Sequence, residues 1–361
     1  MKKILAILLA AVMVLGLAAC GSSGSTASNS NVSTNTNPGE SAATSGSTDS
    51  GTSTTPADAT PADPGDAASG TYTVGIIQLV QHDALDAATQ GFQDALKEAL
   101  GDAVVFDYQN AQGDSATCST IATSFVANGY DLIMANATPA LQAAVSATAD
   151  IPVLGTSVTD YETALAMSFD PSVGTGINVA GSSDGVPGQL YADLLMELVP
   201  DAKNVSIIYC SAEANSVVQA RDFMGAMPAG VSCTEYTFSD SNDLQSVVTA
   251  AAEGCDAIYI PTDNTAASNM TIVRNICEPA GIPIIAGEEN MCANGGLATV
   301  SISYYNIGYV CGQQAVAILR DGADVSAMPI AYASNPVKEY NAEYAEAIGF
   351  DIPDGFEPIG G

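Results

Sequence analysis

The strongest constraint on the fold is an alternation of apolar, strand-length segments with helix-length amphipathic segments from Tyr72 onward. The predicted strands are Thr73–Leu79, Val104–Tyr108, Leu132–Ala137, Pro152–Val158, Val205–Cys210, Val231–Phe238, Ala257–Pro261, Ile282–Ala286 and Ala298–Ser303. The predicted helices are Ala84–Leu100, Ala116–Asn128, Pro139–Ala149, Gln189–Leu198, Val217–Met227, Leu244–Glu253, Ala266–Pro279 and Ile307–Arg320. Continuous apolar strands alternating with helices are typical of parallel sheets covered on both faces.

A passage rich in Gly, Asn and Ser, residues 174–188, separates the strands into two groups. We therefore predict an α/β protein with two similar, doubly wound parallel-sheet lobes. A short tail is expected to return through a strand at Ile330–Ser334 and a helix at Ala342–Gly349.

The N-terminal segment, residues 1–19, predicts an export signal. Two lysines precede an uncharged apolar run that is too short for a comfortable membrane span. The run ends in Leu-Ala-Ala-Cys, which resembles the lipobox of bacterial lipoproteins, so we expect Cys20 to be acylated and to begin the mature chain. The alternative is an ordinary signal with a chance cysteine. Residues 20–69 lack apolar periodicity and predict a flexible tether.

The charge balance disfavours nucleic acid and anionic lipid as partners. The formal net charge is −32, mainly because the chain has only 8 Lys and Arg residues. Such a surface repels polyanions.

Polar side chains follow nearly every predicted strand. In open parallel sheets, ligands bind outside the carboxyl ends of the strands. Any one of these residues, taken alone, is better explained as an ordinary helix cap. Their agreement across both lobes predicts a cleft for a polar small molecule between the lobes.

The segment Thr262-Asp263-Asn264 indicates the charge of that molecule. Asp263 follows a buried strand and has no Lys or Arg nearby in sequence, so a ligand ammonium group would supply its partner. The alternative is that Thr262 or Asp263 caps the next helix. In the first lobe, Thr138, Ser157 and Thr159 stand at strand ends and suit a carboxylate. Together these groups describe an α-amino acid.

The sequence does not indicate an enzyme. Gly181–Gly185 fits G-x-S-x-G, but the only histidine, His82, lies about a hundred residues earlier. His82 and Asp86 alone make a poor zinc site, and phosphate-binding glycine loops are missing, so we expect neither metal nor cofactor. His82 is either a residue of the cleft wall or a surface or capping histidine.

Seven cysteines remain after Cys20. Most lie inside predicted strands and helices, where a thiol behaves as a small apolar group. We expect a disulfide between Cys277 and Cys292.

Several stretches in order resemble the substrate-binding lipoproteins of ABC transporters, of the tryptophan- and tyrosine-binding type. They are V-G-I-I-Q-L-V-Q-H-D-A-L-D at 74–86, N-A-Q-G-D at 110–114, A-T-P-A-L-Q-A at 137–143, T-S-V-T-D at 156–160, G-S-S-D at 181–184, E-A-N-S at 213–216, I-P-T-D-N at 260–264 and G-G-L-A at 295–298. The chain departs from the family at Gln81 and Tyr161, and it has no tryptophan. An aromatic wall would have to come from residues such as Tyr209, Tyr304 or Tyr305.

The resemblance implies the type I periplasmic-binding-protein fold. Residues 70–183 and 303–328 would form the N-terminal lobe, and residues 184–302 and 329–355 the C-terminal lobe. Three crossovers would form the hinge. The expected ligand contacts are Gln78, His82, Asp86, Thr138, Ser157, Thr159, Asp184, Glu213, Asn215, Asp263 and Asn264.

The resemblance also implies a monomer, lipid-anchored outside the bacterial cell membrane, that delivers its ligand to an ABC permease and ATPase. Two alternatives stay open: a neutral ligand such as a nucleoside or sugar, and a ligand-sensing domain without transport.

Overall fold

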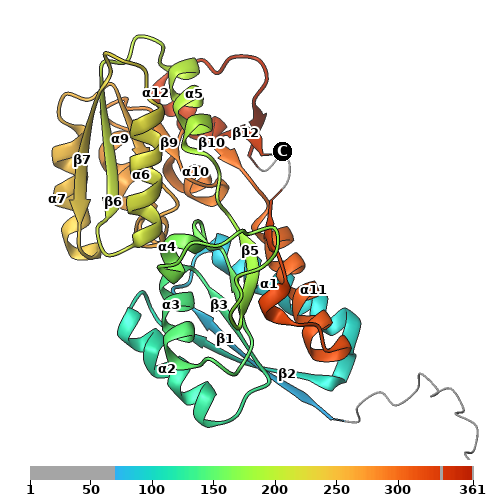
Figure 1. Cartoon of the computed structure of the whole chain (residues 1–361). Coiled ribbons are helices and arrows are strands. Elements are labelled where there is room, and N and C mark those ends of the chain that lie inside the picture. The colour runs from blue at the N-terminus through green and yellow to red at the C-terminus, as the bar shows by residue number, and fades with distance from the viewer. Residues whose placement is uncertain (1–69, 334–335, 360–361) are drawn as a thin grey trace, which may run out of the picture. The chain divides into compact units, whose positions relative to one another are not determined.

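The computed structural model describes residues 70–333 and 336–359, which belong to one compact unit (Figure 1). The expected export signal, Cys20 and the tether lie outside the described residues. Two parallel sheets, each in its own lobe, organise the unit. None of the helices in the described ranges is both long and apolar enough to cross a membrane.

The N-terminal lobe contains a sheet with the order β11-β5-β4-β3-β1-β2, in which every pairing is parallel. Its strands are β1 (Tyr72–Gln78), β2 (Val104–Asn110), β3 (Leu132–Asn136), β4 (Val153–Thr156), β5 (Val179–Ser183) and β11 (Ile330–Tyr332). Its helices are α1 (Asp83–Leu100), α2 (Ser115–Ala127), α3 (Thr138–Ala147), α4 (Tyr161–Leu165) and α11 (Tyr304–Asp321).

Helices cover both faces of this sheet. Ile76 packs with Phe92 of α1 and Cys311 of α11, whereas the next residue, Ile77, packs with Phe125 of α2. Successive strand residues point to opposite faces, so both must be apolar. Helices α1 and α11 approach closely, since a Cβ atom on Gly308 would lie 1.9 Å from the backbone oxygen of Ala88.

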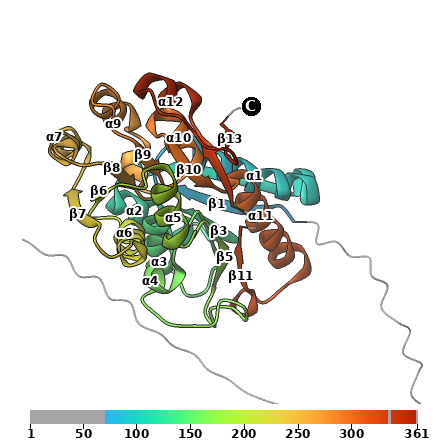
Figure 2. The same ribbon diagram turned by 90° about the horizontal axis from the view of Figure 1, so that it is seen from above.

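The C-terminal lobe contains a sheet with the order β13-β12-β10-β9-β8-β6-β7 (Figure 2). Its strands are β6 (Asn204–Cys210), β7 (Ser232–Phe238), β8 (Ala257–Ile260), β9 (Ile284–Ala286), β10 (Ala298–Ser301), β12 (Val337–Tyr340) and β13 (Glu357–Pro358). Its helices are α5 (Gly188–Leu198), α6 (Ala214–Ala226), α7 (Ser241–Ala252), α8 (Asn264–Ala267), α9 (Met270–Cys277), α10 (Glu289–Gly295) and α12 (Ala342–Ile348). Only β12 runs antiparallel to its partner β10 among the pairings described.

The predicted strands are confirmed apart from their ends. Helices α4 and α10 and strands β12 and β13 were not predicted, and three further features differ from the prediction. Strand β5 falls within the passage predicted to separate the lobes, because Val-Ala-Gly-Ser-Ser carries few large apolar side chains. It is paired on both sides, by β4 and β11, and these pairings compensate for its small residues. Residues 330–332 were assigned to the C-terminal lobe, yet they pair with β5 of the first sheet. The helix expected at 266–279 is two helices, α8 and α9.

The predicted disulfide between Cys277 and Cys292 is wrong. All seven cysteines among the described residues are free, and these two are fully buried in the core of the C-terminal lobe. Burial raises the pKa of the Cys277 thiol to about 12 and that of Cys292 well above its ordinary value. Both thiols therefore act as small apolar groups.

Candidate functional site

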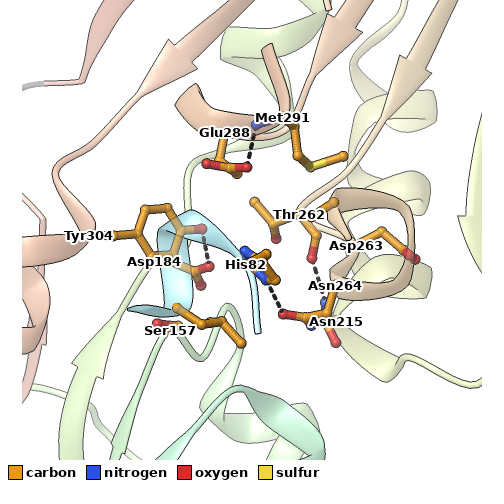
Figure 3. Close-up of a pocket in the computed structure, with 12 residues that line it drawn as sticks. His82, Ser157, Asp184, Asn215, Thr262, Asp263, Asn264, Glu288, Met291 and Tyr304 are labelled. Carbon is orange, nitrogen blue, oxygen red and sulfur yellow. Dashed lines mark hydrogen bonds between the residues drawn. The ribbon is translucent and has the colours of Figure 1, made fainter. Parts of the chain in front are cut away.

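A small cavity lies where the carboxyl ends of strands from both sheets meet (Figure 3). Loops after β1, β4 and β5 line it from the N-terminal lobe, and loops after β6, β8 and β9 line it from the C-terminal lobe. The lining residues are His82, Leu85, Ser157, Asp184, Asn215, Thr262, Asp263, Asn264, Ala267, Glu288, Met291 and Tyr304. Six of the eleven expected contacts are among them.

Four of those six residues carry a buried polar atom without a hydrogen-bond partner. The atoms are His82 Nδ1, Ser157 Oγ, Asp184 Oδ1 and Asn215 Oδ1. Thr138 Oγ1, at the start of α3, is in the same state. Buried polar groups in folded proteins are nearly always hydrogen-bonded. Unpaired atoms gathered around one cavity therefore mark positions at which a polar ligand would complete the bonding.

The N-terminal lobe holds its hydroxyl groups on strained backbone. Ala137, just before Thr138, has a φ of 93°, and Ser157 has a φ of 54°. Both follow paired positions of neighbouring strands, because Asn136 of β3 lies opposite Thr156 of β4. Non-glycine residues with positive φ cost free energy and cluster at binding sites. The two strand ends thus present hydroxyl groups next to the first turn of α3, whose leading N–H groups lack partners within the helix.

Asp184 is the acidic group most open to a ligand. It directly follows β5, and its Oδ2 accepts a hydrogen bond of 2.7 Å from the hydroxyl of Tyr304 (Figure 3). Its Oδ1 is buried without a partner. Burial raises the pKa of Asp184 from its ordinary value, although the bonds from Tyr304 and Thr159 act in the opposite direction. A ligand cation at Oδ1 would favour the ionised form.

Asp263 is held by protein donors instead. Its Oδ1 accepts from the backbone N–H of Ala266 at 2.8 Å, and its Oδ2 accepts from the Cys210 N–H at 2.7 Å and the Ser216 hydroxyl at 2.8 Å. The inference that this carboxylate needs a ligand ammonium is therefore wrong, and the capping alternative is confirmed. Burial, and then the charge of Glu213, raise the pKa of Asp263.

Glu213 and Asn264 join two loops of the C-terminal lobe. The Glu213 carboxylate accepts from the backbone N–H and side-chain Nδ2 of Asn264, at 3.0 and 2.6 Å. It also accepts from the N–H and hydroxyl of Thr265, both at 2.9 Å. Asn264 Oδ1 then lies 3.3 Å from His82 Nε2 of the N-terminal lobe (Figure 3). Glu213 itself does not line the cavity.

The remaining expected contacts lie behind or beside the cavity. Gln78 is fully buried and its Nε2 donates to Asp86 Oδ1 at 2.6 Å, while its Oε1 accepts from the Thr89 hydroxyl at 2.7 Å. Gln78 and Asp86 therefore brace the loop that carries His82. Thr159 Oγ1 accepts from Gln219 Nε2 at 2.9 Å and so links the two lobes.

Sequence reasoning missed several residues of the wall. Glu288 follows β9 and is not among the expected contacts. Its two oxygens accept from the backbone N–H groups of Asn290 and Met291, and burial raises its pKa to about 7. Tyr304 alone of the three candidate tyrosines lines the cavity, since Tyr209 donates to Glu235 and Tyr305 is 39% exposed. The polar strand-exit signal locates Thr262 and Glu288, whereas nothing local marks Leu85, Ala267 or Met291.

Metal ligation finds no support in the described ranges, where no group of three or more His, Cys, Asp or Glu side chains could hold an ion. The chemistry of the cavity is that of hydrogen bonding and charge pairing.

Comparisons with known proteins agree with this geometry. The family model described as ABC transporter substrate binding protein matches residues 73–356. A tyrosine-binding protein from Clostridioides difficile (strain R20291) is 37% identical over 262 residues, which cover 71% of this chain and 75% of the relative.

Two solved structures are also similar. An ABC domain in complex with L-Trp from Streptococcus pneumonia is 33% identical with a TM-score of 0.75, over 79% of this chain and 97% of that chain. The ligand-free, open structure of a Clostridium difficile substrate-binding protein with adhesive properties is 36% identical with a TM-score of 0.61, over 80% and 99%. By TM-score, the chain is therefore more similar to the L-Trp complex than to the open structure, although the L-Trp complex has the slightly lower sequence identity.

Proposed function

The chain belongs to the family of ABC transporter substrate-binding proteins, and we propose that it captures a small zwitterion, an amino acid, in the cavity between its lobes. Its fold is that of type I periplasmic-binding proteins. Such proteins work outside the cytoplasm with a permease and an ATPase. The ligand is bound and passed on without chemical change.

The unpaired Oδ1 of Asp184 carries the proposal. The Tyr304 hydroxyl bonds to the other oxygen of this carboxylate, and Asp184 is 5% exposed. The described residues that line the cavity include no Lys or Arg. A ligand ammonium therefore has a buried acceptor ready for it, and a charge-assisted bond of this kind contributes about 1.5–3 kcal/mol. Asn215 Oδ1, from the opposite lobe, offers a second acceptor.

The carboxylate of the ligand is assigned to the ends of β3 and β4. The hydroxyl groups of Thr138 and Ser157 are buried and unpaired there, and α3 begins at Thr138. Hydroxyl donors beside the N-terminus of a helix favour an anion because the helix dipole and the leading N–H groups act together. From the sequence, we expect the C-terminal lobe to bind the ammonium group and the N-terminal lobe to bind the carboxylate. In the arrangement proposed here, the N-terminal lobe binds both charged groups of the ligand.

Closure of the lobes excludes water from the bound ligand. Cross-lobe contacts join Thr159 to Gln219 and His82 to Asn264. The chain passes between the lobes after Ser183, near Ser303 and after Tyr332, where each strand or helix of one lobe gives way to the other. These passages are the proposed hinge.

The same proposal includes membrane anchoring through an acylated Cys20 and the tether that follows it. The lipobox-like residues before Cys20 support it. Loss of membrane association on Cys20→Ala, with unchanged ligand affinity, is the expected result.

Calorimetric titration against the twenty amino acids, a nucleoside and a hexose tests the ligand class. We expect at least one amino acid to bind with micromolar affinity or better and the neutral compounds to give no heat. If a sugar or nucleoside binds and no amino acid does, the role of Asp184 as an ammonium acceptor is wrong.

A further inference from the structure

A chain of hydrogen bonds runs from Glu213 through Asn264 to His82 and crosses from the C-terminal to the N-terminal lobe. The bonded distances are 2.6 Å from Asn264 Nδ2 to Glu213 Oε2, and 3.3 Å from Asn264 Oδ1 to His82 Nε2. The far nitrogen of the imidazole, Nδ1, is buried and has no partner. The direction of each bond follows from the chemistry of the residue before it.

Glu213 sets the orientation of the Asn264 side chain. An ionised carboxylate only accepts hydrogen bonds. Glu213 accepts four, from two groups of Asn264 and two groups of Thr265. The amide NH₂ of Asn264 must therefore face Glu213, because the reverse orientation would place its carbonyl oxygen against the carboxylate. As a result, Asn264 presents its oxygen to His82.

Asn264 in turn sets the tautomer of His82. An oxygen facing Nε2 requires that Nε2 carry the proton. Burial lowers the pKa of His82 from its ordinary value, although Asn264 and the charges of Glu213, Asp86 and Asp83 act in the opposite direction. A neutral imidazole protonated at Nε2 leaves Nδ1 as an acceptor.

Apolar side chains also line the cavity that His82 reaches. Leu85 stands three residues after His82 and Ala267 three residues after Asn264, and both line the cavity together with Met291. An unpaired acceptor in a cavity that also offers these apolar groups matches a ligand side chain that is apolar apart from one donor. A ligand without that donor would leave Nδ1 buried and unpaired, which costs free energy.

We infer that Glu213, acting through Asn264, is a positioning residue that fixes His82 as the Nε2–H tautomer, and that His82 Nδ1 accepts a hydrogen bond from the side chain of the ligand. The second half of this inference rests on the proposed function, whereas the first half does not.

The single histidine of the chain makes the tautomer measurable. In protein labelled with ¹⁵N at histidine, the imidazole nitrogens give one pair of resonances, whose positions distinguish the two tautomers and the imidazolium. The ligand-free protein at neutral pH is expected to show Nε2 protonated and Nδ1 bare. Protonation of Nδ1, alone or together with Nε2, overturns the inference.

Glu213→Gln tests the positioning role. A glutamine amide both donates and accepts, so it tolerates either orientation of Asn264, and the Nδ1–H tautomer should become populated. Glu235→Gln is the matched control, since Glu235 is an exposed carboxylate of the same lobe that accepts only from Tyr209. A Glu213→Gln spectrum identical to that of the parent protein overturns the role. If this variant does not fold, the tautomer of the parent protein still decides the first half.

L-Tyrosine and L-phenylalanine test the second half because they differ by one hydroxyl group. We expect L-tyrosine to bind at least 10-fold more tightly and to move the Nδ1 resonance, with no such movement for L-phenylalanine. Equal affinities, tighter L-phenylalanine or no binding by either compound overturns this half. If none of the twenty amino acids binds, the proposed function is wrong as well. The assignment of the His82 tautomer in the ligand-free protein is tested separately, by its own ¹⁵N spectrum.

Discussion

The two lobes build their sides of the cavity in opposite ways. The N-terminal lobe presents unpaired atoms, namely His82 Nδ1, Ser157 Oγ and Asp184 Oδ1. Thr138 Oγ1 is a further unpaired atom of this lobe, although Thr138 does not line the cavity. The C-terminal lobe presents two carboxylates whose oxygens are already bonded, on Asp263 and Glu288, and Asn215 Oδ1 is its one unpaired atom among the described lining residues. A third bonded carboxylate of this lobe, on Glu213, holds Asn264 without lining the cavity.

The contrast separates binding from support. Unpaired atoms gain bonds when a ligand arrives, whereas bonded carboxylates hold their loops whether or not a ligand is present. Substitutions in the N-terminal lobe should therefore lower affinity with little loss of stability. Substitutions of the acids in the C-terminal lobe should lower stability first.

Asp263→Ala is expected to have the largest effect, a loss of about 3–5 kcal/mol in the free energy of unfolding. The change leaves the N–H groups of Ala266 and Cys210 and the Ser216 hydroxyl without their acceptor, and each unpaired buried donor costs about 1–3 kcal/mol. Urea denaturation followed by circular dichroism measures it. Asp240→Ala is the matched control, because Asp240 caps α7 in the same lobe but is exposed, and should lose about 1 kcal/mol.

An equal loss in the two variants would contradict the supporting role of Asp263. So would an Asp263→Ala variant with unchanged stability that loses only ligand affinity.

Asp184→Asn should reduce affinity for the amino-acid ligand about 100-fold, because it removes the buried counter-charge of the ammonium group. The asparagine keeps an oxygen for the Tyr304 hydroxyl, so stability should change by less than about 1 kcal/mol. Titration calorimetry and urea denaturation measure the two quantities. Asp160→Asn, in a loop that does not line the cavity, should leave affinity unchanged. If Asp184→Asn keeps the affinity of the parent protein, Asp184 does not bind the ammonium group of the ligand.

Glu288 should make stability depend on pH in the direction opposite to an ordinary salt-bridged acid. Burial raises its pKa from 4.5 to about 7, so the folded protein binds the proton more tightly than the unfolded chain. Stability contributed by this group is full below 4.5 and is lost as the pH rises toward 7, at up to about 1.4 kcal/mol per pH unit. Since Glu288→Gln does not titrate, the stability of the parent relative to this variant should fall across that range. Parallel denaturation profiles would show that the two N–H donors offset the burial.

The sequence predicted the two-lobed fold well because large apolar strands and glycine-terminated helices are local signals. It failed where the stabilising partner is distant in the chain. Strand β5 has only small residues and depends on pairing with β4 and β11, and β11 lies about 150 residues later. The short strand β12, antiparallel to β10, carries no pattern that separates it from a loop.

For the site, the rule that ligands meet the carboxyl ends of strands located the right loops. The rule does not show which of the acidic side chains there has an oxygen without a hydrogen-bond donor from the protein. Asp263 and Asp184 both follow buried strands without a basic neighbour in sequence, yet only the fold brings the Cys210 N–H and the Ser216 hydroxyl to Asp263. Leu85 and Met291 line the cavity through helix packing and carry no polar signal.

Ser157→Gly is expected to have the smallest effects of these variants. It should raise stability while lowering ligand affinity, and so separates the two roles at one residue. Glycine accepts a φ of 54° without strain, so the free energy of unfolding should rise by up to about 1 kcal/mol. The lost hydroxyl should weaken ligand binding about 10-fold, which corresponds to one hydrogen bond to a charged group. Ala166→Gly is the control for strain alone, since Ala166 has a φ of 51° at the end of α4 and does not line the cavity. It should gain similar stability with unchanged affinity. If Ser157→Gly gains stability and keeps its affinity, the strained serine does not bind the ligand, and the carboxylate must be held by Thr138 and the first turn of α3.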